Sequence, residues 1–138
     1  MDKVLDFWFG TICDTDEYFS GRNKIWYGKD DGFDEKVKAF IPLIEQANSG
    51  KLDDWAQDPR GRLALIILFD QFPRNSFRDS PQMYAYDQKA RALCLEGLDS
   101  GADKQLHMIE RAFFYLPLEH SELLEDQKKC CLLFEELV

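Results

Sequence analysis

The feature that most constrains the fold is a run of seven apolar residues followed at once by a polar segment. Residues 63–69 read LALIILF, so a helix over this run is apolar on every face and has to be buried. Residues 70–75 read DQFPRN and bring a carboxylate, two amides and a guanidinium to the end of that helix. Buried polar groups cost free energy unless they are paired. The sequence therefore predicts a polar site at the end of a buried helix.

Length, composition and charge indicate one folded, acidic domain. The chain has 138 residues, of which 45% are hydrophobic, so we expect a single domain over residues 1–138 with a sizeable core. The net charge of −9 argues against binding to nucleic acid or an anionic membrane, because both need a basic surface. No uncharged apolar run reaches about 18 residues, so we expect no membrane span.

The cysteines and the N-terminal residues favour a reducing, cytoplasmic compartment. The four cysteines form no C-x-x-C pair, and Cys130 and Cys131 are neighbours whose side chains point in different directions on a helix. We expect the thiols to fill the core rather than form disulfides or a zinc site. Asp6 and Gly10 interrupt any apolar stretch of a secretory signal. We therefore expect a cytoplasmic protein without a metal or cofactor.

Helical periodicity recurs along the chain, and alternating strand patterns are absent. Helices are predicted over residues 3–9, 34–49, 59–71, 80–96, 104–115 and from 121 onward, and residues 11–32 are expected to form a connection that Trp26 and Tyr27 pin to the core. Pro42 is expected to kink or split its helix, whereas Pro73 and Pro117 are expected to end theirs. The predicted fold class is all-α, an array of antiparallel helical hairpins.

Three predicted helices each place one polar residue in an otherwise apolar face. These residues are Asp70, Asp87 and Gln127, each three, four or seven positions from apolar residues of its own helix. We expect them to converge in one buried cluster that includes cationic partners. An alternative is an internal network that only fixes the order of the helices. The candidate cations are Arg74, Arg78, Arg91 and Arg111, of which Arg91 could pair locally with Asp87.

The segment over residues 117–122 reads PLEHSE and places a histidine between two carboxylates. His120 with Glu119 or Asp70 could act as a general base or as a metal ligand. Its spacing matches neither the H-E-x-x-H nor the E-x-x-H pattern, so a metal site is disfavoured. Ser121 and Glu122 are also expected to cap the last helix.

Arg74 and Asn75, with Arg78 nearby, gather donors at the end of the buried helix. Such a cluster could bind a carboxylate or a phosphate, or it could neutralise the chain's own Asp70 and Asp79. The glycine-rich nucleotide-binding motifs and the G-x-S-x-G motif are absent from the sequence. The donors therefore indicate an anion site without indicating a nucleotide or a nucleophilic serine.

Four stretches together resemble the motifs of the bacterial domain-of-unknown-function family 924. They read VLDFWFG over residues 4–10, LDDW over 52–55, LFDQFPRN over 68–75 and LPLEHSE over 116–122, the last followed by Asp126 and Gln127. The resemblance implies a tetratricopeptide-like all-α fold in a bacterial helical-repeat protein with no established activity. It also implies a further basic segment beyond the last helix, so we expect a shortened member or a fragment. Uncovered apolar residues on that helix would then favour a homodimer.

Three hypotheses about function remain open. The first is a binding module with a polar cleft for a small anionic ligand or an acidic peptide. The second is a hydrolase, with or without a metal, whose catalytic candidates are His120, Glu119 and Asp70. The third is a structural subunit in which the polar network only specifies the fold. The candidate ligand-binding residues are Asp70, Gln71, Arg74, Asn75, Asp87, Glu119, His120, Glu122 and Gln127.

Overall fold

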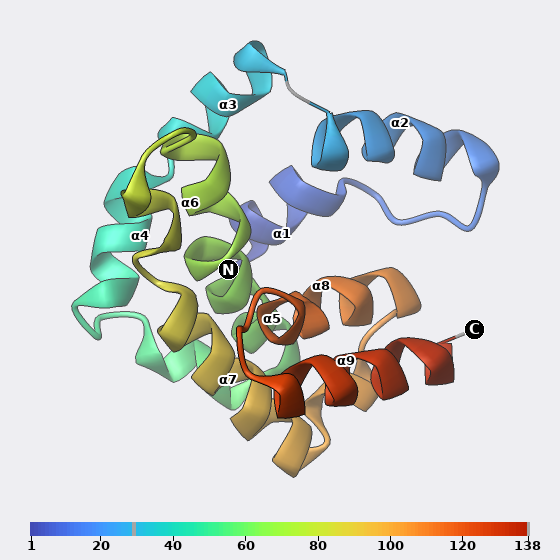
Figure 1. The fold of residues 1–138 in the computed structure, drawn as a ribbon. Coiled ribbons are helices and arrows are strands. Elements are labelled where there is room, and N and C mark those ends of the chain that lie inside the picture. Colours follow the sequence, from blue (N-terminus) through green and yellow to red (C-terminus); the bar gives the residue numbers. More distant parts are fainter. Residues whose placement is uncertain (29, 138) are drawn as a thin grey trace.

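A computed structural model describes residues 1–28 and 30–137, and these residues form helices without a β-strand (Figure 1). The all-α prediction is confirmed, whereas the antiparallel tetratricopeptide-like arrangement stays a prediction. None of the described helices is long and apolar enough to cross a membrane. The elements in order are α1 Asp2–Phe9, α2 Asp16–Tyr27, α3 Asp31–Lys38, α4 Ile41–Asn48, η1 Asp53–Gln57, α5 Pro59–Phe69, α6 Gln71–Ser76, η2 Pro81–Tyr84, α7 Asp87–Ser100, η3 Ala102–Gln105, α8 Met108–Glu119 and α9 Leu124–Leu137, where η marks a 3-10 helix.

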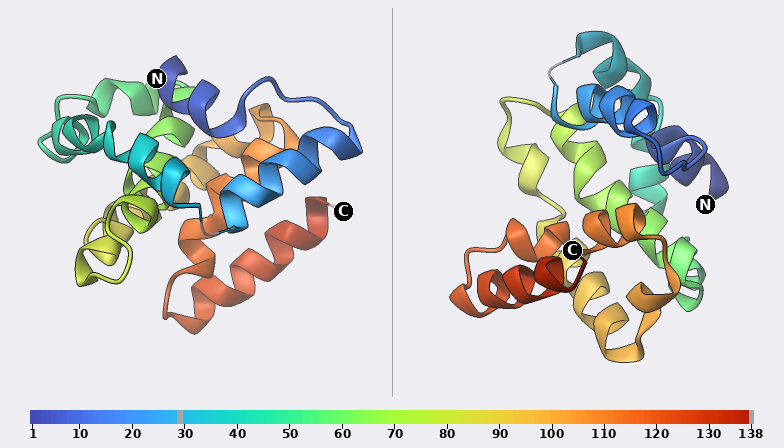
Figure 2. Two further views of the ribbon diagram at one scale, coloured as in Figure 1. Left: turned by 90° about the horizontal axis from the view of Figure 1, so that it is seen from above. Right: turned by 90° about the vertical axis from the view of Figure 1, so that its right-hand side faces the viewer.

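Helix α5 is the centre of the molecule, and α1, α4, α6, α7 and α8 all contact it (Figures 1 and 2). Every residue from Leu63 to Phe69 is buried, as the apolar run predicts. The helix begins where the sequence indicates, because Asp58 accepts a hydrogen bond from the Gly61 amide at 3.1 Å and Pro59 is the first helical residue. The end of this helix therefore delivers Asp70 to the interior.

Aromatic side chains join α1 and α2 to the core. Trp8 and Trp26 stack with ring centroids 6.3 Å apart, and the indole Nε1 of Trp26 donates to the carbonyl of Trp8 at 3.0 Å. The predicted connection over residues 11–32 is wrong for most of its length, because α2 occupies it. Helix α2 buries only Trp26, so it shows no apolar stripe in the sequence. Tyr27 is 73% exposed and does not anchor the segment.

The helix expected to end before Pro73 does end, at Phe69, and Pro73 lies in the next helix, whereas Pro117 lies inside the helix that it is expected to end. Pro73 is the third residue of α6, where the backbone N–H of any residue lacks a partner within the helix, so no hydrogen bond is lost. Pro117 lies within α8 between buried Leu116 and Leu118, and we attribute the continuous helix to the packing of this segment. Pro42 agrees with its prediction, because it stands at the start of α4 and the predicted helix is split there into α3 and α4.

Several helix starts differ from the prediction. Asp30, rather than Asp34, caps α3, and this frees Asp34 for a contact described below. The helix expected from residue 80 is split, since η2 precedes it and α7 begins only at Asp87. His107, which was expected inside a helix, caps α8 and forms a reciprocal capping box with Glu110.

The cysteines divide evenly between the core and the surface. Cys94 and Cys130 are buried, as a core-filling role requires, whereas Cys13 and Cys131 are exposed. Burial raises the pKa of the Cys94 thiol, and it raises the pKa of Cys130 to about 11, so both buried thiols stay protonated at neutral pH. The core-filling prediction therefore holds for two of the four.

Candidate functional site

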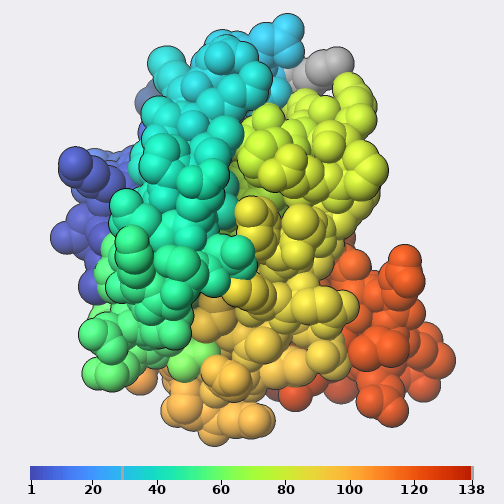
Figure 3. Space-filling model, turned by 90° about the vertical axis from the view of Figure 1, so that its left-hand side faces the viewer, coloured from blue at the N-terminus to red at the C-terminus, as the bar shows by residue number. Residues whose placement is uncertain are grey.

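A polar cleft of about 850 Å³ opens between the η2–α7 segment and the connection from α8 to α9. Figure 3 shows these two segments side by side, η2 and α7 in yellow and the connection in orange-red. The lining residues are Arg74, Met83, Tyr84, Asp87, Gln88, Arg91, Pro117, His120, Ser121, Glu122 and Leu123.

Asp70 lies behind this cleft at the corner where α5 ends and α6 begins. Its side chain is 1% exposed. Its Oδ1 lies 2.7 Å from Nδ1 of His120 and accepts from Arg74 at 3.2 Å, while its Oδ2 accepts from the amide of Gln71 at 2.8 Å. The carboxylate is thus buried but satisfied at both oxygens, as buried charge requires.

The contacts of Asp70 fix the protonation pattern of the His120 ring. An ionised carboxylate only accepts hydrogen bonds, so a neutral imidazole in this position donates its Nδ1–H and keeps the lone pair on Nε2. The side chain of His120 is 25% exposed and lines the cleft. No hydrogen bond to Nε2 is found within the described part of the chain. His120 therefore offers a proton acceptor to the cleft.

Arg74 joins Asp70 to Asp87. Its guanidinium binds both oxygens of Asp87, at 2.9 and 3.0 Å, and also donates to the backbone carbonyl of Asp70 at 2.8 Å. Burial lowers the pKa of Arg74, but the hydrogen bonds that Arg74 donates to Asp87 and the charge of Asp70 outweigh this and raise the pKa above its ordinary value. The charge of Arg74 is therefore balanced by carboxylates of the fold.

Arg91 pairs across the cleft with α9 and not with Asp87. Its Nε and Nη2 bind the carboxylate of Asp126, which also accepts from the hydroxyl of Ser121 at 2.6 Å. The hydrogen bond from Arg91 is the main reason why the pKa of Asp126 lies below its ordinary value. The expected local pair with Asp87 is wrong, since that carboxylate binds Arg74. Ser121 accepts a hydrogen bond at 3.1 Å from the amide of Leu123, which lies before the first residue of α9, so this contact is not the expected cap of the helix.

Asn75 and Arg78 belong to a second network on α3. Asn75 donates to Asp34 at 2.9 Å, and Nε of Arg78 donates to the same carboxylate at 2.6 Å. Burial raises the pKa of Asp34, but these two hydrogen bonds outweigh burial and leave the pKa below its usual value. Neither Asn75 nor Asp34 lines the polar cleft. The side chains of the neighbouring residues Arg74 and Asn75 therefore belong to two different networks.

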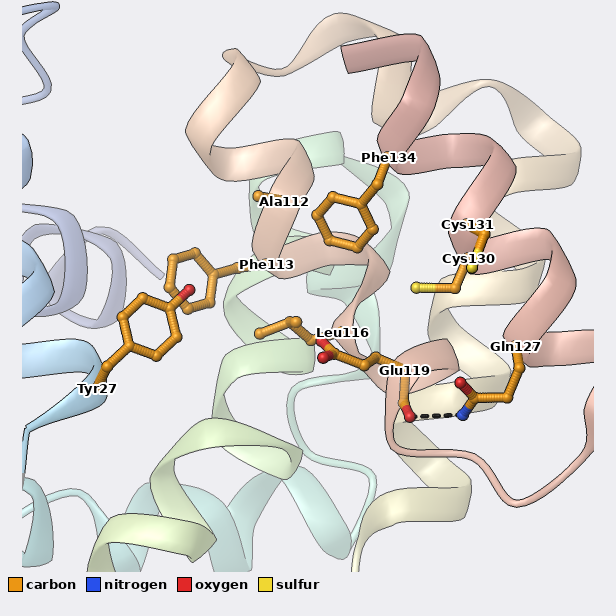
Figure 4. A pocket seen from close by; sticks show the side chains of 9 residues that line it. All are labelled: Tyr27, Ala112, Phe113, Leu116, Glu119, Gln127, Cys130, Cys131 and Phe134. Carbon is orange, nitrogen blue, oxygen red and sulfur yellow. Dashed lines mark hydrogen bonds between the residues drawn. The ribbon is translucent and has the colours of Figure 1, made fainter. Parts of the chain in front are cut away.

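Glu119 and Gln127 line a different, more apolar pocket of about 450 Å³ (Figure 4). The amide of Gln127 donates to the backbone carbonyls of Glu119 at 2.7 Å and Ser121 at 2.6 Å. Gln127 thereby fixes the connection between α8 and α9. Of the three residues expected to converge, Asp70 and Asp87 meet through Arg74, with His120 beside Asp70, whereas Gln127 lies outside this cluster.

Sequence reasoning missed part of the cleft wall. Tyr84 and Gln88 come from η2 and α7, which were read as one helix, and Tyr84 lies with its ring 5.5 Å from the Arg74 guanidinium. The available signal was a spacing: Tyr84 stands three residues before Asp87, and residues three apart on a predicted helix share a face. Within residues 1–28 and 30–137, no three His, Cys, Asp or Glu side chains are grouped to hold a metal ion.

Comparison with known proteins gives a family and a fold, and it gives no activity. A family model described as "Bacterial protein of unknown function (DUF924)" matches residues 4–138. A solved structure of a protein of unknown function from Agrobacterium tumefaciens has 35% sequence identity and a TM-score of 0.85, and the match covers 99% of this chain and 73% of that chain. No curated protein matches.

Proposed function

Because this chain belongs to the DUF924 family of bacterial proteins of unknown function, we propose a function from the geometry of its polar cleft. The cleft is an acid–base catalytic site in which His120 accepts and returns a proton and Asp70 orients its ring. One observation carries the proposal: Nδ1 of His120 lies 2.7 Å from a buried carboxylate oxygen of Asp70, while the ring lines an open cleft.

A buried carboxylate supports a histidine base in two ways. It holds the ring in one orientation and one tautomer, and it stabilises the imidazolium that forms when Nε2 takes a proton. Asp70 is held in turn by Gln71 and Arg74, and Arg74 is held by Asp87. A series of side-chain contacts therefore holds the proton acceptor in place, as a catalytic group needs.

The lining of the cleft favours hydrolysis by an activated water. No cysteine lines the described part of the cleft, and the hydroxyl of Ser121 donates to Asp126 instead of facing a base. A covalent nucleophile next to His120 is therefore not supported, whereas a water on Nε2 is. This arrangement corresponds to the hydrolase hypothesis, with His120 as base and Asp70 as the positioning residue.

The other two hypotheses have weaker support. An anion site at Arg74 and Asn75 would need free donors, but Arg74 is paired with two carboxylates and Asn75 donates to Asp34. A network that only specifies the fold would not need a histidine at the edge of an open cleft. The homodimer expected through the C-terminal helix stays a prediction.

Nitrogen NMR of the two histidines tests the proposed base without any substrate. At a pH where both rings are neutral, His120 is expected to carry its proton on Nδ1. His107 is an internal control with the opposite pattern, because its Nδ1 accepts from the Ile109 amide and the proton must therefore be on Nε2. Asp70→Asn is expected to abolish the preference of His120 only. A proton found on Nε2 of His120 would contradict the proposed role.

An activity screen tests the reaction class. We expect turnover of at least one ester, amide or phosphate-ester substrate, and His120→Gln is expected to reduce it about 100-fold or more, as loss of a general base does. His107→Gln is the matched control, because His107 caps α8 outside the cleft, and it should leave turnover unchanged. Turnover that survives in His120→Gln would assign the activity to another part of the molecule.

A further inference from the structure

We infer that the polar cleft takes a positively charged ligand, an amine or guanidinium that carries an apolar or aromatic group. The inference deepens the proposed function and rests on it, because it names the substrate class of the same cleft. It rests on the charge balance of the cleft, on one carboxylate at its mouth and on the apolar side chains of its walls.

The charge balance of the cleft disfavours an anion. Both guanidiniums that line it are already paired, Arg74 with Asp87 and Arg91 with Asp126. With His120 neutral, the carboxylates outnumber the guanidiniums by two and leave a negative potential that attracts a cation. The groups that line the cleft or bind its lining are the carboxylates of Asp70, Asp87, Glu122 and Asp126 and the guanidiniums of Arg74 and Arg91.

Glu122 supplies the counter-charge for such a ligand. It lines the cleft from the connection between α8 and α9, and it is exposed. Its carboxylate forms no ion pair or side-chain hydrogen bond with any residue that the structure describes. The other three carboxylates are occupied by arginine, so Glu122 is the one that a bound cation can contact directly.

The walls of the cleft match the apolar part of the ligand. Tyr84 is 57% exposed on η2, Leu123 is 53% exposed in the connection that precedes α9, and both line the cleft. Met83 and Pro117 extend these apolar walls. A ligand that covers them removes apolar surface from water. The ring of Tyr84 lies 5.5 Å from the Arg74 guanidinium in a cation–π contact.

Three aromatic ligands of similar size and different charge test the inference. Benzylammonium, benzyl alcohol and benzoate share a ring and differ in the charge of the attached group. Binding is followed by NMR, through the ring signals of His120 and the methyl signals of Leu123. Benzylammonium is expected to bind most tightly and benzoate least. Raising the ionic strength should weaken only the binding of benzylammonium.

The Glu122→Gln variant tests the assigned counter-charge. It should weaken benzylammonium about three-fold, the size expected for one exposed ion pair, and leave benzyl alcohol unchanged. Glu125→Gln is the matched control, because Glu125 is an exposed carboxylate of α9 that does not line the cleft. Both substitutions are at exposed positions, so the fold should be unaffected.

Two results would overturn the inference. One is benzoate binding as tightly as benzylammonium or more tightly, and the other is no binding of benzylammonium at millimolar concentration. The tautomer of His120 is measured in the free protein, so it reports on the proposed base whatever these ligands do. A correct tautomer with benzoate preferred would therefore refute the ligand class alone.

Discussion

Nδ1 of His120 lies 2.7 Å from Oδ1 of Asp70, although fifty residues separate them in the sequence. His120 follows the last residue of α8, and Asp70 follows the last residue of α5. Two helix ends thus meet at the same place. This contact links the centre of the fold to the cleft, and it decides which ring nitrogen faces the ligand.

Replacing Asp70 by Asn should be strongly destabilising. The variant keeps the size of the side chain, but it removes the negative charge that Arg74 and His120 share. Breaking a buried ion pair from one side costs about 3–5 kcal/mol of unfolding free energy. Urea unfolding at neutral pH measures the loss, and Asp54→Asn, at an exposed site, should change it by less than about 0.5 kcal/mol. Equal stability of the two variants would mean that the pair contributes nothing to the fold.

Asp126 should make the protein sensitive to acid. Its pKa is below the ordinary value of 3.8 in the folded protein, first because Arg91 donates to it and also because Ser121 does. A depressed carboxyl pKa contributes stability above the unfolded value, and this contribution is lost as the pH falls through the folded value. The urea midpoint of the wild type should therefore fall more steeply below about pH 4 than that of Asp126→Asn.

The control for the acid measurement is Asp99→Asn, because Asp99 is an exposed aspartate of α7. The urea midpoint of this variant should fall below about pH 4 as steeply as that of the wild type. If Asp126→Asn also keeps the wild-type slope, the contact between Arg91 and Asp126 does not hold the carboxylate in its charged form.

Two glycine substitutions should act in opposite directions. A Cβ on Gly97 would lie 2.7 Å from Cδ of Arg62 and still closer to the ring of Phe114, so Gly97→Ala overpacks the place where α7 meets α5 and α8. The expected loss is about 1–3 kcal/mol. A Cβ on Gly21 in α2 meets no atom within 4 Å, so Gly21→Ala should stabilise the protein by about 0.5–1 kcal/mol through its helix propensity. Thermal unfolding compares both with the wild type, and stabilisation by Gly97→Ala would contradict the close packing.

Gln127→Ala should reduce stability without changing the tautomer of His120. The substitution leaves the carbonyls of Glu119 and Ser121 without their side-chain donor, which should cost about 1–2 kcal/mol. Because Gln127 does not contact Asp70, the Nδ1–H tautomer of His120 should persist. Chemical unfolding and nitrogen NMR separate the two effects. A change of tautomer in this variant would show that Gln127 is coupled to Asp70 and His120.

The sequence predicted those elements whose causes are local. The apolar run marks α5 from Leu63 to Phe69, and the Asp58-Pro59 pair marks its start, because capping and burial depend on neighbouring residues. Helix α2 is not predicted because Trp26 is its only buried residue, so its sequence has no periodic stripe of apolar residues. The prediction from Pro117 is wrong because local rules omit the packing around the helix, whereas the end of α5 before Pro73 agrees with its prediction.

The partners of the polar residues depend on long-range packing, and this sets the limit of prediction for the site. The sequence marked Asp70, Asp87 and His120 as polar residues in unusual places, and the structure brings these three together. The sequence did not reveal that Asn75 donates to Asp34, because Asp34 stands at the start of a predicted helix, where a carboxylate needs no distant partner. Charge and spacing identify which groups need a partner, whereas the choice of partner follows from how the helices pack.

The corner at Asp70 also has a consequence for synthesis on the ribosome. When α5 and α6 have just emerged from the ribosome, the carboxylate of Asp70 has Arg74, four positions further on, beside it. Among the described contacts, Arg74 is the only local counter-charge of this carboxylate. The imidazole emerges only fifty residues later. The ionic contact between Asp70 and Arg74 can therefore form early, whereas the contact between Asp70 and His120 can form only after α8 has left the exit tunnel.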